Sequence, residues 1–94
     1  MISLEGRTAI VTGAGALDDG IGNGRAAALL LARAGANVVA ADRDLTRAEQ
    51  TVRMIEQEGG TAFPFAFDVT AETECAGLVE TTLREFGSLH ILDN

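Results

Sequence analysis

Apolar and polar positions divide the chain into short apolar runs that alternate with longer segments of helical periodicity. The apolar runs are 7–12, 37–41, 61–67 and 89–92, and short continuous runs of this kind are typical of strands buried on both faces of a parallel sheet. The segments 21–34, 44–58 and 71–86 lie between them and place apolar residues at helical spacing. The pattern therefore predicts β-α-β-α-β-α-β.

Each helical segment has an apolar stripe that predicts its buried face. Either Asp44 or Thr46 can cap the second helix, and Thr46 with Glu49 has the spacing of a capping box. The residues expected on the three stripes are Ile21, Ala28, Leu31 and Ala32 in the first helix, Leu45, Ala48, Val52 and Ile55 in the second, and Cys75, Leu78, Val79 and Thr82 in the third.

Short connections between these elements favour parallel strands with right-handed crossovers and helices on both faces of the sheet. The expected fold class is α/β, a three-layer doubly wound arrangement of Rossmann type with strand order 3-2-1-4. Pro64 lies inside the third strand, and because proline cannot donate to a strand ladder, this strand is expected at an edge. No linker or repeat divides the chain, so residues 1–94 form one segment.

The stretch from Thr12 to Gly24, TGAGALDDGIGNG, is rich in glycine and joins the first strand to the first helix. A strand, a glycine loop and a helix in this order present backbone N–H groups and a helix N-terminus to a phosphate. The missing side chain of Gly24 would also allow close contact with a strand. We interpret the loop as the site that holds the pyrophosphate of a dinucleotide.

Asp42 lies at the end of the second strand, 20 residues beyond Gly22. A carboxylate at this distance accepts hydrogen bonds from an adenosine ribose and repels a 2′-phosphate, which favours NAD over NADP. Arg43 beside it keeps NADP open. The alternative interpretation is that Asp42 is an ordinary residue at a strand end.

The composition argues against several classes of binding partner and metal site. The net charge of −7 argues against nucleic acid and anionic membranes. A single cysteine, Cys75, excludes an intramolecular disulfide and a cysteine-cluster metal site; we expect it to fill the core. Two acidic pairs, Asp18 with Asp19 and Asp68 with Glu72, are expected to be solvated, so no metal site is predicted. We expect a soluble cytoplasmic protein, since no signal peptide and no long apolar run is recognised.

Together these motifs resemble the short-chain dehydrogenase/reductases, over essentially all 94 residues. Thr12-Gly13 with Gly20-Ile21-Gly22 is similar to the family's TGxxxGxG loop. Asp42-Arg43 is similar to its coenzyme-selecting position and Asp68-Val69 to its adenine-contacting dipeptide, while 86–94 resembles FGxLDILVN. The resemblance implies an NAD-binding segment whose cofactor contacts are Thr12, Gly13, Gly15, Gly20, Ile21, Gly22, Asp42, Arg43, Asp68, Val69 and Asn94.

The chain departs from the family pattern in three respects. Six residues rather than three separate Gly13 from Gly20, and Asp18 and Asp19 in this longer loop are expected to point to solvent. His90 replaces a residue usually written as Asp, and Asp93 one usually written as Val; we expect His90 to be non-catalytic. The chain has no tyrosine and no lysine, so the YxxxK pair that the family uses for catalysis is absent.

The resemblance therefore implies an NAD(P)-dependent oxidoreductase of which this chain is the cofactor-binding N-terminal part, an incomplete domain without the catalytic and substrate-binding part. No catalytic residue is assigned. One alternative is a non-catalytic nucleotide-binding or interaction module, in which the exposed edge of the fourth strand pairs with another chain, as in a homo-oligomer. A methyltransferase that binds S-adenosylmethionine is a third hypothesis, against which the Thr12-Gly13 opening counts.

Overall fold

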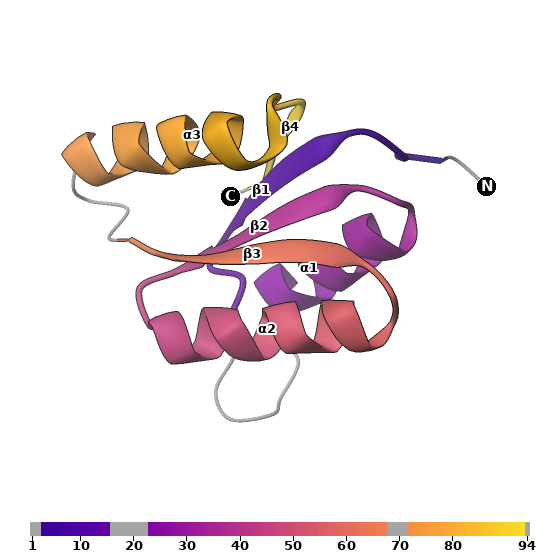
Figure 1. The fold of residues 1–94 in the computed structure, drawn as a ribbon. Helices are drawn as coiled ribbons and strands as arrows, with labels where there is room; N and C mark the ends of the chain where they lie inside the picture. Colours follow the sequence, from indigo (N-terminus) through magenta and orange to yellow (C-terminus); the bar gives the residue numbers. More distant parts are fainter. Residues whose placement is uncertain (1–2, 16–22, 68–71, 94) are drawn as a thin grey trace.

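The computed structural model describes residues 3–15, 23–67 and 72–93, and within them strands and helices alternate as the sequence predicts (Figure 1). The elements are β1 (Thr8–Thr12), α1 (Asn23–Arg33), β2 (Asn37–Asp42), α2 (Leu45–Gln57), β3 (Thr61–Ala66), α3 (Glu72–Phe86) and β4 (Ile91–Asp93). The fourth strand begins two residues later than predicted, although the His90 N–H already donates to the Thr8 carbonyl oxygen at 2.9 Å.

The strands form one parallel sheet in the order β3-β2-β1-β4, which confirms the predicted topology. β3 is an edge strand among the described strands, and its Pro64 lies opposite Ala40 of β2. An edge strand needs to donate its N–H groups to one neighbour at most, so a proline is tolerated there.

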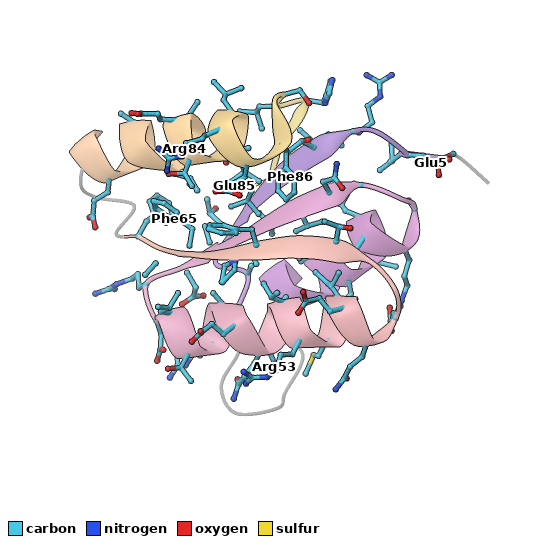
Figure 2. All side chains as sticks on the ribbon, in the orientation of Figure 1. Glu5, Arg53, Phe65, Arg84, Glu85 and Phe86 are labelled. Atoms are coloured by element: carbon cyan, nitrogen blue, oxygen red, sulfur yellow. The ribbon has the colours of Figure 1, made fainter. Side chains whose placement is uncertain are left out.

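Helices cover both faces of the sheet: α1 and α2 lie on one side and α3 on the other (Figure 1). Neighbouring residues of each inner strand alternate between the two faces. Val11, Val38 and Ala40 pack with α1 and α2, whereas Ile10, Val39 and Ala41 face Leu78 of α3. Phe65 and Phe86 extend this second core, and Figure 2 shows both side chains between the sheet and α3.

Burial of the predicted helix stripes is confirmed for some of their residues. Ala28, Ala48, Val52, Ile55, Leu78 and Thr82 are buried. Leu45 and Val79 were expected to be buried as well, and both expectations are wrong, because their exposed fractions are 45% and 39%. Leu45 is the first residue of α2, and Val79 lies with Leu83 on a face of α3 that turns away from the sheet. Ile21 and the Cys75 side chain lie outside the described residues.

Asp44 is the N-cap of α2. Its Oδ1 accepts hydrogen bonds from the backbone N–H groups of Thr46 at 2.9 Å and Arg47 at 3.4 Å. The structure therefore selects Asp44 from the two predicted caps, and the capping box of Thr46 with Glu49 is wrong because Thr46 lies inside the helix. This cap lies two residues after the end of β2, so α2 begins close to Asp42.

Candidate functional site: the glycine turn and its neighbours

Residues Gly13 to Gly15 form the glycine turn, which follows β1 at the carboxyl edge of the sheet. Gly13 has a positive φ of 62°. The Ala14 N–H donates to the carbonyl oxygen of Ala41 at 3.0 Å, and the Gly15 N–H donates to Oδ2 of Asp42 at 3.0 Å. The turn is therefore attached to the end of β2 by one main-chain and one side-chain hydrogen bond.

The first turn of α1 packs directly on the glycine turn. A Cβ built on Gly24 would lie 2.6 Å from the carbonyl carbon of Gly13 and 3.2 Å from the Cα of Ala14, and closer still to the Gly13 carbonyl oxygen. Only glycine allows this approach of helix and turn. The sequence predicted such a contact for Gly24 with a strand, and the structure places it just beyond the end of β1.

Gly15 packs closely against α2, much as Gly24 packs against the glycine turn. A Cβ on Gly15 would lie 2.5 Å from the Cβ of Arg47 and 3.0 Å from Oδ2 of Asp42. The first turn of α2 therefore forms the outer wall of the glycine turn. Arg47 directs its guanidinium elsewhere, with Nε 3.5 Å from Oδ2 of its neighbour Asp44.

Asp42 is half-buried, and both of its carboxylate oxygens accept backbone hydrogen bonds, Oδ2 from Gly15 and Oδ1 from Asp44 at 2.9 Å. An ionised carboxylate has about four acceptor positions, so two remain for the hydroxyl groups of a ribose. Arg43, the next residue, is exposed. The structure thus brings Asp42 to the glycine turn, where the sequence predicted it.

Two buried polar residues at this site were not predicted as functional. Arg25 in α1 and Thr51 in α2 are both inaccessible to solvent, and Arg25 Nε donates to Thr51 Oγ1 at 2.9 Å. No role was predicted for Arg25, which precedes the buried Ala28 and Leu29 by three and four residues. That spacing is the signal that places it on the inner face of the helix.

The structure describes only some of the other residues that were predicted to contact the cofactor. Thr12 ends β1, one residue before the turn. Phe67 is buried, and its N–H donates to the Asp42 carbonyl oxygen at 3.0 Å. The predicted cofactor contacts Gly20, Ile21, Gly22, Asp68, Val69 and Asn94, and the loop acids Asp18 and Asp19, lie outside the described residues.

His90 was expected to be non-catalytic. Its Nδ1 accepts a hydrogen bond from the backbone N–H of Thr8 at 3.1 Å. Thr8 is the first residue of β1, so His90 contacts the amino end of that strand, whereas the glycine turn follows the carboxyl end. This hydrogen bond joins the segment before β4 to the start of β1.

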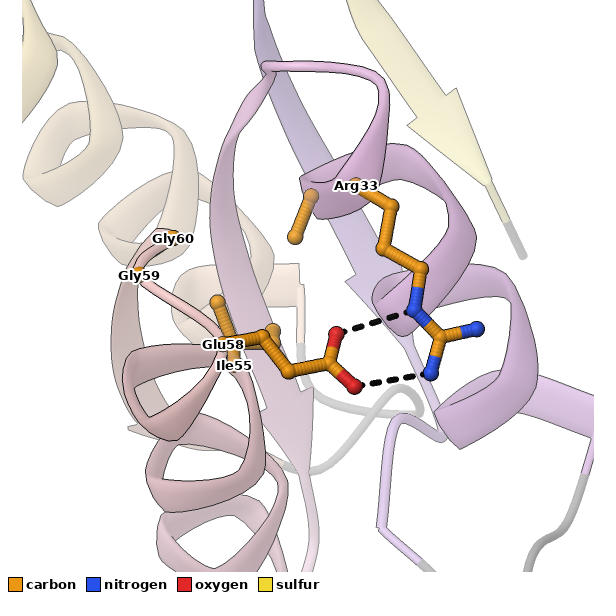
Figure 3. A pocket seen from close by; sticks show the side chains of 6 residues that line it. Arg33, Ile55, Glu58, Gly59 and Gly60 are labelled. Carbon is orange, nitrogen blue, oxygen red and sulfur yellow. Dashed lines mark hydrogen bonds and ion pairs between the residues drawn. The ribbon is translucent and has the colours of Figure 1, made fainter.

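A hollow of about 280 Å³ lies between the C-terminal ends of α1 and α2 (Figure 3). Arg33 on its rim donates to both carboxylate oxygens of Glu58, from Nε at 2.9 Å and from Nη2 at 2.8 Å. Hydrogen bonds from Arg33 lower the pKa of Glu58 below its ordinary value of 4.5, and those to Glu58 raise the pKa of Arg33. Because both helices run back to the amino ends of the strands, this hollow is separate from the glycine turn.

Within the part of the chain that the structure describes, no group of three or more His, Cys, Asp and Glu side chains could hold a metal ion. None of the helices in the same residues is both long enough and apolar enough to cross a membrane.

Residues 7–94 match the family described as short chain dehydrogenase, and the chain belongs to this family. It is 39% identical over 93 residues to a 7alpha-hydroxysteroid dehydrogenase of Escherichia coli, covering 99% of this chain and 34% of that protein. It is also 36% identical over 89 residues to a short-chain dehydrogenase/reductase homolog of Bacillus subtilis, YusS, covering 94% of this chain and 77% of that protein. The chain thus spans about a third of the E. coli relative but most of YusS.

Solved structures agree with this assignment. A hydroxysteroid dehydrogenase from Escherichia coli superposes with a TM-score of 0.89 at 39% identity, covering 96% of this chain and 36% of that one. A 7 alpha-hydroxysteroid dehydrogenase complexed with NADH and 7-oxo glycochenodeoxycholic acid superposes with a TM-score of 0.88 at 39% identity, covering 96% of this chain and 33% of that one. The predicted family and fold class are confirmed.

Proposed function

We propose that this chain is the cofactor-binding N-terminal part of a short-chain dehydrogenase and binds the adenosine and pyrophosphate groups of NAD. The hydrogen bond from Gly15 to Asp42 carries this proposal, because it sets a carboxylate with free acceptor positions beside the glycine turn. One ligand can then place a ribose on Asp42 and its phosphates at the turn. The family and a structural neighbour that was crystallised with NADH support a nicotinamide dinucleotide.

The choice of NAD over NADP rests on the charge of Asp42. A 2′-phosphate bound there would meet the carboxylate, and like charges at close range repel strongly. Exposed Arg43 is the residue that would favour NADP. We propose NAD as the preferred coenzyme, with Thr12, Gly13, Gly20, Ile21, Gly22, Asp68, Val69 and Asn94 as its further contacts, and the cytoplasm as the compartment.

The complete enzyme that we propose transfers hydride between NAD and an alcohol or carbonyl group. This chain contributes coenzyme binding to that reaction. It does not contribute the YxxxK pair, because its 94 residues include no tyrosine and no lysine. We therefore expect the 94-residue chain by itself to bind NAD without oxidising any alcohol.

Titration of the chain with NAD, NADP and S-adenosylmethionine tests the proposal, with the melting temperature as readout and an alcohol oxidation assay in parallel. A ligand at ten times its Kd stabilises the fold by about 1.4 kcal/mol, which raises the Tm of a domain of this size by about 5–10 °C. NAD should produce this shift at a lower concentration than NADP. Absence of a shift with either nucleotide, or a shift with S-adenosylmethionine alone, would contradict the proposal.

A second candidate function is a non-catalytic nucleotide-binding or interaction module. The relative YusS favours it, because this chain covers 77% of that protein's length. Such a module would pair through the β4 edge of the sheet with another chain. Sedimentation of the chain alone and with NAD distinguishes the two candidates: a module of this kind forms a stable oligomer, whereas the first proposal requires only a monomer that binds NAD.

A further inference from the structure

Arg25 is a charged side chain in the interior of the protein, at the point where α1 meets α2. It is fully buried, and buried arginine occurs in proteins almost only when it is paired by hydrogen bonds. Its guanidinium reaches three acceptors on α2. Nε donates to Thr51 Oγ1 at 2.9 Å, and Nη2 donates to the Arg47 carbonyl oxygen and to Gln50 Oε1, each at 3.3 Å. The planar fork of arginine therefore joins the first turn of α1 to two turns of α2.

Thr51 carries this connection on to the glycine turn. Its hydroxyl accepts from Arg25 and donates to the Ala14 carbonyl oxygen at 2.8 Å, whereas the Arg47 carbonyl oxygen lies farther away at 3.4 Å. Ala14 is itself fully buried. The Ala14 N–H donates to β2 and its carbonyl oxygen accepts from the Thr51 hydroxyl, so the peptide groups on both sides of Ala14 are held.

The same two residues bear on the position of Gly15. Arg25 bonds the carbonyl oxygen of Arg47, and the Cβ of Arg47 is the atom against which Gly15 packs. A shift of α2 would therefore move the wall of the glycine turn, and with it the hydrogen bond from Gly15 to Asp42. Geometric tolerances at binding and reacting groups are tight, and a displacement of about 1 Å can cost two orders of magnitude in rate.

We propose that Arg25 and Thr51 are positioning residues for the phosphate-binding turn: they hold the Ala14 carbonyl group and the first turns of α2 so that the turn is already formed before the coenzyme binds. The inference rests on the proposed function in so far as the bound group is the pyrophosphate. It adds a role for two residues that make no proposed contact with the coenzyme. Loss of either residue should weaken binding of the phosphates and leave binding of the nucleoside nearly unchanged.

The decisive variant is Thr51→Val, which keeps the shape of the side chain and removes the hydroxyl. Thr51→Ser restores the hydroxyl, and Arg53→Met serves as the control, because Arg53 is an exposed arginine on the same helix (Figure 2). Arg25→Lys keeps the positive charge but has no planar fork to join the three acceptors. If Thr51→Val does not fold, Arg25→Lys takes its place in both measurements below.

The first measurement needs no ligand. Amide hydrogen exchange of the free 94-residue chain should be at least tenfold faster at Ala14 and Gly15 in Thr51→Val than in the wild type. The amide of Val39 in the centre of the sheet serves as the reference for global opening. Thr51→Ser and Arg53→Met should exchange as the wild type does. Equal acceleration at Val39 and Gly15, or none at Gly15, would overturn the positioning role.

The second measurement compares the Kd of ADP with that of adenosine, at a temperature where every variant is folded. Thr51→Val should weaken ADP at least tenfold and adenosine by less than threefold, with recovery in Thr51→Ser. Equal losses for both ligands would overturn the proposal, since a purely structural defect does not distinguish them. If the wild-type chain binds neither ADP nor NAD, the proposed function fails, and the exchange measurement alone decides whether Arg25 and Thr51 position the turn.

Discussion

The close contact between Gly24 and the glycine turn can be tested by adding a single methyl group at Gly24. In the substitution Gly24→Ala, the new Cβ would lie 2.6 Å from the Gly13 carbonyl carbon, whereas ordinary contact begins at 3.4 Å. The carbonyl oxygen would be closer still, and both atoms belong to the main chain, so no flexible side chain can move away. Either α1 or the glycine turn must shift by more than about 1 Å to relieve the contact with the carbonyl oxygen.

Overpacking of this kind costs about 1–3 kcal/mol. Alanine returns at most about 1 kcal/mol through its higher helix propensity, and less near a helix end. We therefore expect Gly24→Ala to lower the free energy of unfolding by about 1–2 kcal/mol and the Tm by about 5–15 °C. Because the shift occurs at the proposed phosphate site, the Kd for NAD should rise at least tenfold in the protein that remains folded.

Gly77→Ala is the matched control. Gly77 lies in the middle of α3, and a Cβ there would meet no atom within 4 Å. The same chemical change should therefore raise the free energy of unfolding by about 0.5–1 kcal/mol and leave NAD binding unaltered. Thermal unfolding followed by circular dichroism measures both variants. A Gly24→Ala protein as stable as the wild type, with NAD affinity within twofold of it, would refute the close approach of α1 to the glycine turn.

Other substitutions test the surroundings of the turn. Asp42→Asn keeps an acceptor oxygen but removes the charge, so NAD should bind about tenfold more weakly because charged hydrogen bonds are lost. The preference for NAD over NADP should also fall. Isothermal titration with both nucleotides measures the two affinities, and an unchanged preference would contradict the role of the charge. Asp44→Ala removes the N-cap of α2 and should cost about 1 kcal/mol in urea unfolding, whereas Asp44→Ser should cost little. Glu58→Gln should lower the Tm at pH 7, because Arg33 lowers the pKa of Glu58 and the pair therefore stabilises the fold above pH 4.5. This difference should disappear as the pH falls through the lowered pKa, and a difference that persists in strong acid would contradict the assignment.

The periodicity of apolar residues was sufficient to predict the fold. Continuous apolar runs such as Asn37 to Ala41 are typical of buried parallel strands, and Pro64 predicted that its strand lies at the edge of the sheet. The position of Asp42 at the glycine turn followed from the same topology, since strand ends in a parallel sheet meet at one edge. These features depend on backbone geometry, which a one-dimensional pattern encodes well.

Features that depend on the fit of individual side chains were not predicted. The burial of Arg25 was not predicted, because the acceptors on α2 that offset its cost are distant in sequence. Leu45 and Val79 were expected in the core for their hydrophobicity, although helix orientation leaves them exposed. The choice between NAD and NADP, which we propose depends on the balance of Asp42 and Arg43, is determined by neither periodicity nor topology.

The hydrogen bonds and close approaches that shape the glycine turn come from the first half of the chain. Gly13 to Gly15 follow β1, and their partners Gly24, Asp42 and Thr51 belong to α1, β2 and α2. The longest of these hydrogen bonds, from Thr51 to Ala14, spans 37 residues, and chains fold from the N-terminal side during synthesis. We therefore expect the phosphate-binding turn to take shape while a ribosome is still adding the residues beyond α2, before the later coenzyme contacts that we propose have been synthesised.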